Sequence, residues 1–158
     1  MRAKTTVLVI FLFLFVIASA LPGCVTTKNE MSGAPTRYKV AIANVTVYAE
    51  AANTPQQQQQ GLMNRKSLNE NAGMLFILPK EERPSVWMKN VIIPLDVIFI
   101  TADLRVLEIY RSVPPCAGIL CPLYTPSAPI KYVLEVNAGL TDRHGVKVGD
   151  AVLVAPVS

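Results

Sequence analysis

Asp96 is the residue whose sequence surroundings most need a chemical explanation. It is the one charged side chain between Val91 and Ile100, where Val, Ile, Leu and Phe dominate. A run of this length is too short to cross a bilayer and fits a strand that is buried on both faces. An ionised carboxylate there is costly unless a cation or several donors meet it. We therefore predict that Asp96 is bound by a cation, main-chain amides or a ligand, on the strand face that it shares with Ile98 and Ile100.

Three further residues could take part in this chemistry. If residues 90–94 turn the chain, two antiparallel strands would bring Lys89 within pairing distance of Asp96. Arg65, at the end of an expected helix, is a second candidate cation, and Glu135 is a second acid in an otherwise apolar strand. Such a set forms either an internal salt-bridge network that fixes strand register or a small pocket in which a cation holds an anionic or hydroxylated ligand.

The pocket hypothesis adds aromatic and amide side chains to these charges. Trp87 would supply a stacking wall, and Tyr124 would line the pocket or pack in the core. The candidate ligand-binding residues are Arg65, Trp87, Lys89, Asn90, Asp96, Tyr124 and Glu135. An enzymatic alternative uses Asp96 and Glu135 as a carboxylate pair, but the sequence has no G-x-S-x-G, H-E-x-x-H or phosphate-binding loop. We expect binding without catalysis, and neither a metal nor a cofactor.

The three cysteines divide into one near the N-terminus and a close pair. Cys24 ends the segment L-P-G-C, which resembles the lipobox of bacterial lipoproteins, where the Cys becomes the lipid-modified first residue. Cys116 and Cys121 are predicted to form a disulfide that pins a Pro-rich loop, because exported cysteine pairs are usually oxidised. A zinc site would need further ligands, and a redox centre usually has C-x-x-C spacing.

Residues 1–23 have the pattern of a bacterial export signal. Arg2 and Lys4 form a basic start, and an unbroken run of apolar and small residues follows over residues 7–21. The lipobox resemblance implies cleavage before Cys24 and a membrane anchor through the lipid, with an uncleaved membrane anchor as the alternative. Because Asp does not follow the Cys, the resemblance favours the periplasmic face of the outer membrane if the cell is Gram-negative.

The rest of the chain predicts a tether and one domain. Residues 24–37 lack an apolar period and are expected to form a flexible tether, whereas residues 38–158 are long enough for a single domain with its own core. The formal net charge is +4, and two of the cations lie in the export signal. No basic block with interleaved aromatics supports nucleic-acid binding. The expected partners are the membrane and a small ligand or envelope protein.

The apolar pattern predicts a mainly β (α+β) domain. Strands or strand pairs are expected over residues 38–50, 73–78, 85–89, 95–101, 105–113, 130–136 and 145–154, with an ordered loop over 114–129. No alternation of strands with helices appears. We therefore predict a compact, barrel-like antiparallel sheet with one main helix packed on it.

That helix has a clear start in the sequence T-P-Q-Q. Thr54 can cap it, Pro55 suits its first position, and Gln57 can close a capping box. The run of five glutamines over residues 56–60 is expected to form a solvated helix face, and the helix is expected to continue towards Arg65.

Six short blocks in order resemble the family called domain of unknown function 192. They are G-L-M-N-R (61–65), G-M-L-F (73–76), W-M-K-N (87–90), I-P-L-D-V-I-F-I (93–100), Y-V-L-E-V-N-A-G (132–139) and V-G-D (148–150). The resemblance covers about residues 45–154 and implies a compact β-rich fold. Members of this family are often exported or lipid-anchored, and the resemblance implies no reaction. The chain departs from the family pattern at Val86 and Val91, where an aromatic residue and a Thr are usual.

The leading hypothesis is a lipid-anchored extracytoplasmic domain that binds a small polar ligand or an envelope partner without catalysis. The alternatives are a cell-envelope hydrolase that uses Asp96 and Glu135, and a purely structural module.

Overall fold

The computed structural model describes residues 37–157. The expected export signal, Cys24 and nearly all of the expected tether lie outside this range. No helix within it is both long and apolar enough to cross a membrane.

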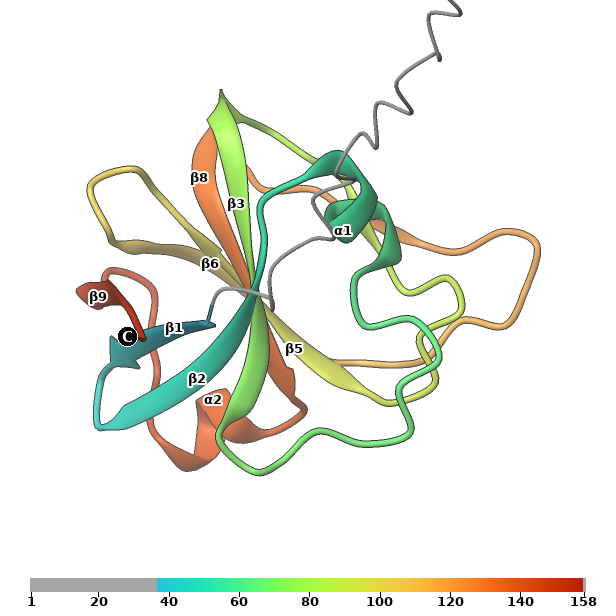
Figure 1. The fold of residues 1–158 in the computed structure, drawn as a ribbon, viewed down its shortest axis with the longest axis horizontal. Helices are drawn as coiled ribbons and strands as arrows, with labels where there is room; N and C mark the ends of the chain where they lie inside the picture. The colour runs from blue at the N-terminus through green and yellow to red at the C-terminus, as the bar shows by residue number, and fades with distance from the viewer. Residues whose placement is uncertain (1–36, 158) are drawn as a thin grey trace, which may run out of the picture. The chain divides into compact units, whose positions relative to one another are not determined.

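Nine strands and two short helices make up the described residues (Figure 1). Seven strands form one sheet in the order β6-β5-β8-β3-β2-β1-β9, and β4 pairs with β7 in a separate ribbon. The strands are β1 (Arg37–Ile42), β2 (Val45–Ala52), β3 (Ala72–Glu82), β4 (Val86–Trp87), β5 (Leu95–Ile100), β6 (Val106–Val113), β7 (Leu123–Tyr124), β8 (Ile130–Asn137) and β9 (Val152–Pro156). The helices are α1 (Pro55–Gln60) and α2 (Leu140–Arg143).

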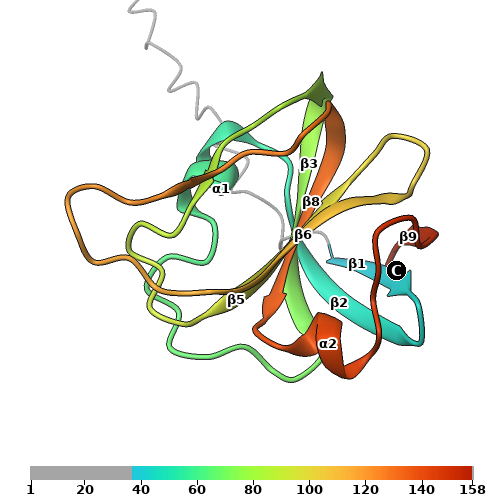
Figure 2. The ribbon, with the colours of Figure 1, turned by 180° about the vertical axis from the view of Figure 1, so that it is seen from behind.

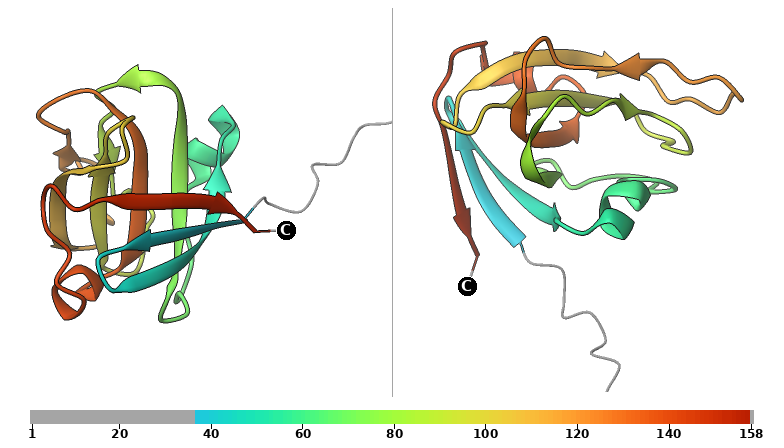
Figure 3. Two further views of the ribbon diagram at one scale, coloured as in Figure 1. Left: turned by 90° about the vertical axis from the view of Figure 1, so that its left-hand side faces the viewer. Right: turned by 90° about the horizontal axis from the view of Figure 1, so that it is seen from above.

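The mainly β prediction is confirmed, whereas the barrel-like sheet is wrong because the sheet is not closed. Its edge strands are β6 and β9. They approach each other at one isolated bridge, Arg105 with Ala151, and β9 then runs along β1 (Figure 3). The sheet is also not wholly antiparallel, since β2 and β3 pair in parallel. A parallel pair needs a crossover connection, and α1 lies within this one.

The capping of α1 is confirmed, but its predicted length is wrong. Thr54 Oγ1 accepts the main-chain N–H of Gln57, and Gln57 Oε1 accepts the N–H of Thr54. The helix ends at Gln60 because Gly61 has a φ of +46°, a backbone conformation that suits Gly and interrupts the helix. It therefore does not continue towards Arg65.

The predicted packing of a main helix on the sheet is also wrong, since no residue of α1 is buried. Its attachment is polar, because Gln58 Nε2 donates to the carbonyl oxygens of Ala52 in β2 and Ile77 in β3, at 3.2 and 3.0 Å. Gln58 therefore attaches the helix to the sheet and does not belong to a solvated face. The apolar side chain that docks beside the helix is Leu62, which is fully buried in the following turn.

Each face of the sheet has its own apolar cluster, because alternate side chains of a strand point in opposite directions. The α2 face holds Ile98, Ile100, Leu134, Val136 and Leu140 among others. The α1 face holds Leu62, Met74, Val97, Phe99 and Val133 among others. In Figure 1, β1, β9 and α2 lie on one side of the central strands, while α1 and the long connections lie on the other. The central strands β3, β5 and β8 therefore present side chains to two separate environments.

The predicted disulfide is confirmed, and it braces one of the long connections. Cys116 and Cys121 are bonded, with Cα atoms 5.8 Å apart. The main chain of Cys116 also bonds that of neighbouring residues, donating to Met88 O and accepting from Asn90 N, both at 3.3 Å. Figure 2 shows the connection between β6 and β8 extending past α1. The disulfide thus closes the loop on itself, and the main-chain bonds of Cys116 hold the loop beside the segment that carries Lys89.

Candidate functional site

The carboxylate of Asp96 is enclosed in the α2 face and saturated with hydrogen bonds. Its side chain is 0% exposed. Oδ1 accepts from the main-chain N–H groups of Ser112 and Gly139, at 2.8 and 3.1 Å. Oδ2 accepts from the N–H and the Oγ1 hydroxyl of Thr141, at 2.9 and 2.6 Å. Four donors meet the charge, as the sequence argument required, so the prediction that Asp96 is bound by main-chain amides is confirmed.

Two irregularities of the backbone bring these donors to Asp96. The register between β5 and β6 shifts opposite Asp96, so that residues 111–112 face one residue of β5. Ser112 takes a φ of +50° in this bulge, which turns its N–H out of the ladder and towards the carboxylate. On the other side, Gly139 with a φ of +78° precedes α2, and Thr141 lies in its first turn.

The cations proposed for Asp96 do not reach it. Within residues 37–157 neither Lys89 nor Arg65 lies within 4 Å of its carboxylate. Lys89 is instead exposed on the other side of the sheet, and Arg65 pairs with Glu50. The predicted pair of Lys89 with Asp96 is therefore wrong, since residues 90–94 do not fold Lys89 back onto β5. Asp96 is sealed in the core and is not available to a ligand.

Glu135 has the opposite situation on the neighbouring strand. It lies on β8, opposite Val97 of β5, while Asp96 lies opposite Val136. Because the two acids occupy adjacent rungs, their side chains point to opposite faces of the sheet. The alternative prediction that Asp96 and Glu135 form a catalytic carboxylate pair is therefore wrong, since the sheet separates the two side chains.

The Glu135 side chain is buried, with 5% of its surface exposed, and makes no hydrogen bond or ion pair with any residue in the range 37–157. Burial without a charged partner raises the pKa of Glu135 to about 8. Every enclosed polar side-chain atom of the described chain has a partner, so the Glu135 oxygens must keep contact with open space. That space is a cavity on the α1 face.

This cavity, of about 230 Å³, is lined by both apolar and polar side chains. Its apolar walls come from Leu62, Met63, Phe76, Leu78, Pro84, Val86, Val91 and Val133. Its polar and charged lining comes from Gln58, Gln59, Gln60, Glu82, Ser85, Lys89 and Glu135, with Trp87 beside Lys89. Concave, largely apolar space with few convergent polar groups is the usual form of a small-molecule site.

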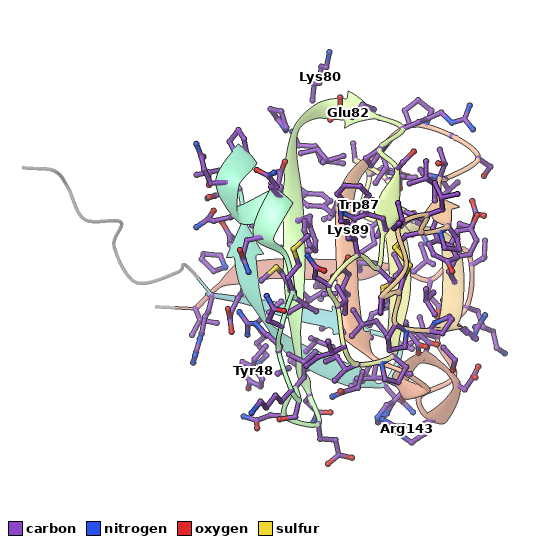
Figure 4. The ribbon with its side chains drawn as sticks, turned by 90° about the vertical axis from the view of Figure 1, so that its right-hand side faces the viewer. Tyr48, Lys80, Glu82, Trp87, Lys89 and Arg143 are labelled. Atoms are coloured by element: carbon purple, nitrogen blue, oxygen red, sulfur yellow. A yellow bond between two sulfur atoms is a disulfide. The ribbon has the colours of Figure 1, made fainter. Side chains whose placement is uncertain are left out.

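Trp87 and Lys89 mark the mouth of the cavity. They are neighbours on the face drawn in Figure 4, with Glu82 above them. The Lys89 ammonium lies over the Trp87 ring, 5.5 Å from its centroid, as a cation–π pair. Both side chains also line a second, more open hollow of about 470 Å³ that includes Asn90. Three of the predicted ligand residues, Trp87, Lys89 and Glu135, therefore meet at one cavity, and Asn90 lies beside it.

The other predicted ligand residues lie elsewhere. Arg65 binds Glu50 at a separate hollow of about 350 Å³, with Nη1 2.7 Å from Oε1. Tyr124 is half-buried and packs edge-on against Tyr110, with ring centroids 5.2 Å apart. It is not among the cavity-lining residues, so packing is the role that the geometry gives it.

Sequence reasoning missed the donors around Asp96 and most of the cavity wall. Gly139 ended a block of the family resemblance, and that was the available signal for the turn before α2. Gly73 had a similar signal in G-M-L-F, and a side chain there would place a Cβ 2.5 Å from the carbonyl oxygen of Glu135. The close pairing of β3 with the main chain of β8 at Glu135 therefore needs Gly73. Nothing in the sequence marked Gln58 or Glu82 as cavity residues.

The site offers hydrogen bonding and charge to a ligand and no assembled metal site. Among residues 37–157 no group of three or more His, Cys, Asp or Glu side chains could hold a metal ion. A carboxyl with a pKa near 8 is neutral at pH 7 and can donate one hydrogen bond as well as accept one. The cavity is thus suited to a partly apolar molecule with one polar end.

Known proteins resemble this chain in both sequence and fold. The sequence pattern of DUF192, described as an uncharacterised ACR, matches residues 38–154. A UPF0127 protein of Thermococcus sibiricus is 30% identical over 86 residues, which are 53% of this chain and 52% of that protein. The chain therefore aligns with about half the length of this curated relative.

Two crystal structures are similar over most of the chain. A Sinorhizobium meliloti protein described as a candidate transcription regulator has 34% identity and a TM-score of 0.70, covering 79% of this chain and 97% of that one. A Novosphingobium aromaticivorans protein of unknown function has 33% identity and a TM-score of 0.68, covering 78% and 88%.

Proposed function

This chain belongs to the DUF192 family of uncharacterised proteins, and from that premise we propose that it is a non-catalytic binding protein for a small, partly apolar ligand. The ligand occupies the cavity of the α1 face, with its polar end at Glu135. The observation that carries this proposal is a buried carboxyl that opens into a cavity and has no partner within residues 37–157. Burying such a group is costly for folding, and a ligand that bonds with it offsets this cost.

Binding without catalysis follows from the chemistry of the lining. The carboxylate pair on which a hydrolase would depend is divided between the two faces of the sheet. In the cavity, the Ser85 hydroxyl is hydrogen-bonded to Thr125 Oγ1, at 2.8 Å, and makes no hydrogen bond to an acidic or basic side chain within residues 37–157. The two positions that depart from the family pattern, Val86 and Val91, both line the cavity. Val91, in place of the usual Thr, removes a hydroxyl from its wall. The ligand of this protein is therefore expected to be less polar than one for a family member with a Thr at position 91.

The test is a screen of small molecules against the purified protein. Trp87 is the one tryptophan of the sequence and lies at the cavity mouth, so its fluorescence reports occupancy directly. A ligand that changes this fluorescence should bind at least about tenfold more weakly to Glu135→Leu, which keeps the side-chain bulk but removes the hydrogen bonds. The matched control is Leu153→Ser, an exposed position on β9, and should bind as the wild type does. If the whole screen leaves Trp87 unchanged, the structural-module alternative is favoured.

We also propose that Cys24 carries a lipid that anchors the protein to a membrane, at the periplasmic face of the outer membrane if the cell is Gram-negative. The support is the sequence L-P-G-C after a basic and apolar N-terminal segment. A labelled fatty acid should be incorporated into the wild-type protein and not into Cys24→Ser, and the variant should leave the membrane fraction. Equal labelling of both proteins would exclude lipidation at Cys24.

A second candidate, binding to an envelope protein, has one favourable observation. The disulfide loop exposes two apolar side chains almost completely, Ile119 at 97% and Leu120 at 91%. Such a pair at the tip of a braced loop is typical of a contact surface. A photocrosslinker at position 119 should then capture one discrete partner in cells, whereas a crosslinker at position 148 should not.

A further inference from the structure

Building on the binding role proposed above, we infer that the ligand carries an ammonium group, which pairs with the carboxylate of Glu135. The inference rests on two carboxyl groups of the cavity that have no partner in the described chain and on the aromatic rings beside them. It names the chemical class of the polar end of the ligand and leaves the apolar part open.

Carboxyl and amide oxygens with unused bonding capacity face the cavity, together with the donors of Gln59, Gln60 and Lys89. Glu82 and Glu135 both line it, and neither is hydrogen-bonded or ion-paired within the described chain. Gln58 spends both hydrogens of its side-chain amide on the carbonyl oxygens of Ala52 and Ile77, so its remaining oxygen can only accept. A ligand that bonds with the unpartnered carboxyl oxygens must therefore bring donors.

The cavity walls also suit a positive charge. Phe76 and Trp87 both line it, and the faces of aromatic rings attract cations. The Lys89 ammonium already occupies one face of Trp87, which demonstrates that this ring accepts a cation. Among residues 37–157, Lys89 is the one cationic side chain lining the cavity. It is exposed and lies at the mouth, whereas Glu135 lies at the buried end.

Few charged groups face Glu135 from the surrounding elements. Glu82 comes from the end of β3, and Lys89 comes from the segment after β4. The residues paired with Glu135 on the adjacent strands are Met74 of β3 and Val97 of β5, and α1 contributes glutamines alone. Once Glu135 is ionised, its carboxylate and that of Glu82 face one cation, so the ammonium group of a ligand then meets a net negative lining.

Binding in this way is coupled to the release of one proton. At pH 7 Glu135 is mainly neutral, since its pKa is about 8. When the ligand enters, the O–H bond of the carboxyl breaks, the proton passes to solvent, and the carboxylate accepts hydrogen bonds from the ammonium group. No bond of the ligand is formed or broken. Affinity for the ammonium form should therefore increase with pH until Glu135 is ionised in the free protein.

The experiment compares three probes of similar shape: benzylammonium, benzyl alcohol and benzoate. Their binding to the purified protein is followed by ¹H–¹⁵N chemical-shift titration. Ligands of this size are expected to bind with millimolar Kd values. Benzylammonium should bind more tightly than benzyl alcohol, about tenfold more tightly at pH 7 than at pH 6, and benzoate should bind most weakly.

Two variants separate the role of Glu135 from a loss of folding. Glu135→Gln should weaken benzylammonium binding at least about tenfold, abolish its pH dependence and leave benzyl alcohol unchanged. Lys89→Ala, at an exposed position, should strengthen benzylammonium binding about threefold by removing a like charge. Equal affinities for the alcohol and the ammonium probe, or an unchanged Glu135→Gln, would overturn the inference and leave the proposed function standing. A protein that binds none of the probes at about 10 mM would contradict both.

Discussion

The two faces of the sheet treat a buried carboxyl group in opposite ways. Asp96 and Glu135 lie on paired strands, one rung apart, and are 0% and 5% exposed. Asp96 receives four hydrogen bonds from three residues. Glu135 receives none from the described chain and opens into a cavity. Burial alone therefore does not identify a functional acid. The informative difference is whether the protein itself uses up the bonding capacity of the group.

The largest expected effect is on the saturated side of this comparison. Asp96→Asn replaces a carboxylate oxygen by an amide that cannot accept, so at least one buried donor loses its partner. We expect the free energy of unfolding to fall by about 3 kcal/mol, measured by urea denaturation at pH 7. Thr141→Val removes the 2.6 Å hydroxyl bond alone and should cost about 1.5 kcal/mol. These donors around Asp96 form what we call the Asp96 cradle. A stability of Asp96→Asn within about 0.5 kcal/mol of wild type would contradict a structural role for this cradle.

The second largest effect is expected from the disulfide of the loop that lies on the cavity side of the sheet. Replacing Cys116 and Cys121 together by Ser removes a short closed loop, and the chain-entropy relation gives a cost of about 2 kcal/mol. Because Cys116 bonds the main chain of Met88 and Asn90, amide exchange should accelerate in residues 86–91. The amide of Thr141, in the Asp96 cradle, should keep its protection relative to global unfolding. Equal loosening of both regions would show that the two faces are not independent.

A third test uses pH to measure the unpartnered acid. The pKa of Glu135 is about 8 in the folded protein and about 4.5 in an unfolded chain. Between these values the folded state holds a proton that the unfolded state has released, so stability decreases as pH rises. The difference in unfolding free energy between wild type and Glu135→Gln should shift against the wild type by about 1.4 kcal/mol between pH 6 and pH 7. Above pH 8 it should level off. A difference that is independent of pH would mean that Glu135 is not desolvated.

Much of the Asp96 site was predictable, because the physical argument needed the local sequence alone. A charge in an apolar strand requires donors, and the period of two placed Asp96 with Ile98 and Ile100. The identity of the donors was not predictable. They depend on a bulge in β6 and a left-handed Gly139, which bring together residues distant in the chain. The proximity of Lys89 to Asp96 in the sequence did not predict a contact, because Lys89 lies on the other side of the sheet.

The fold shows the same division between local and distant information. The capping box of α1 was predictable because Thr54 and Gln57 are three residues apart. Whether the sheet closed was not, since this depends on how β9 leaves the edge of β6 after one bridge. Likewise, the cavity combines α1, β3, β8 and the segment after β4. Trp87 and Lys89 were recognised as candidates from their residue types, whereas Gln58 and Glu82 had no local signal.

The smallest expected effect is at Arg65, which forms an ion pair with a third acid, Glu50. Glu50 lies on the α1 face like Glu135, but the hydrogen bonds from Arg65 lower its pKa. This pair is about one-third exposed, so solvent weakens it, and Arg65→Gln should cost about 0.5 kcal/mol at pH 7. The cost should vanish as pH falls through the lowered pKa of Glu50, opposite in sign to the trend for Glu135. Urea denaturation of both variants from pH 2 to pH 8, a range that extends below the lowered pKa of Glu50, would reveal the opposite trends. If stability changed with pH in the same direction for both variants, the presence of a partner would not explain the difference between Glu50 and Glu135.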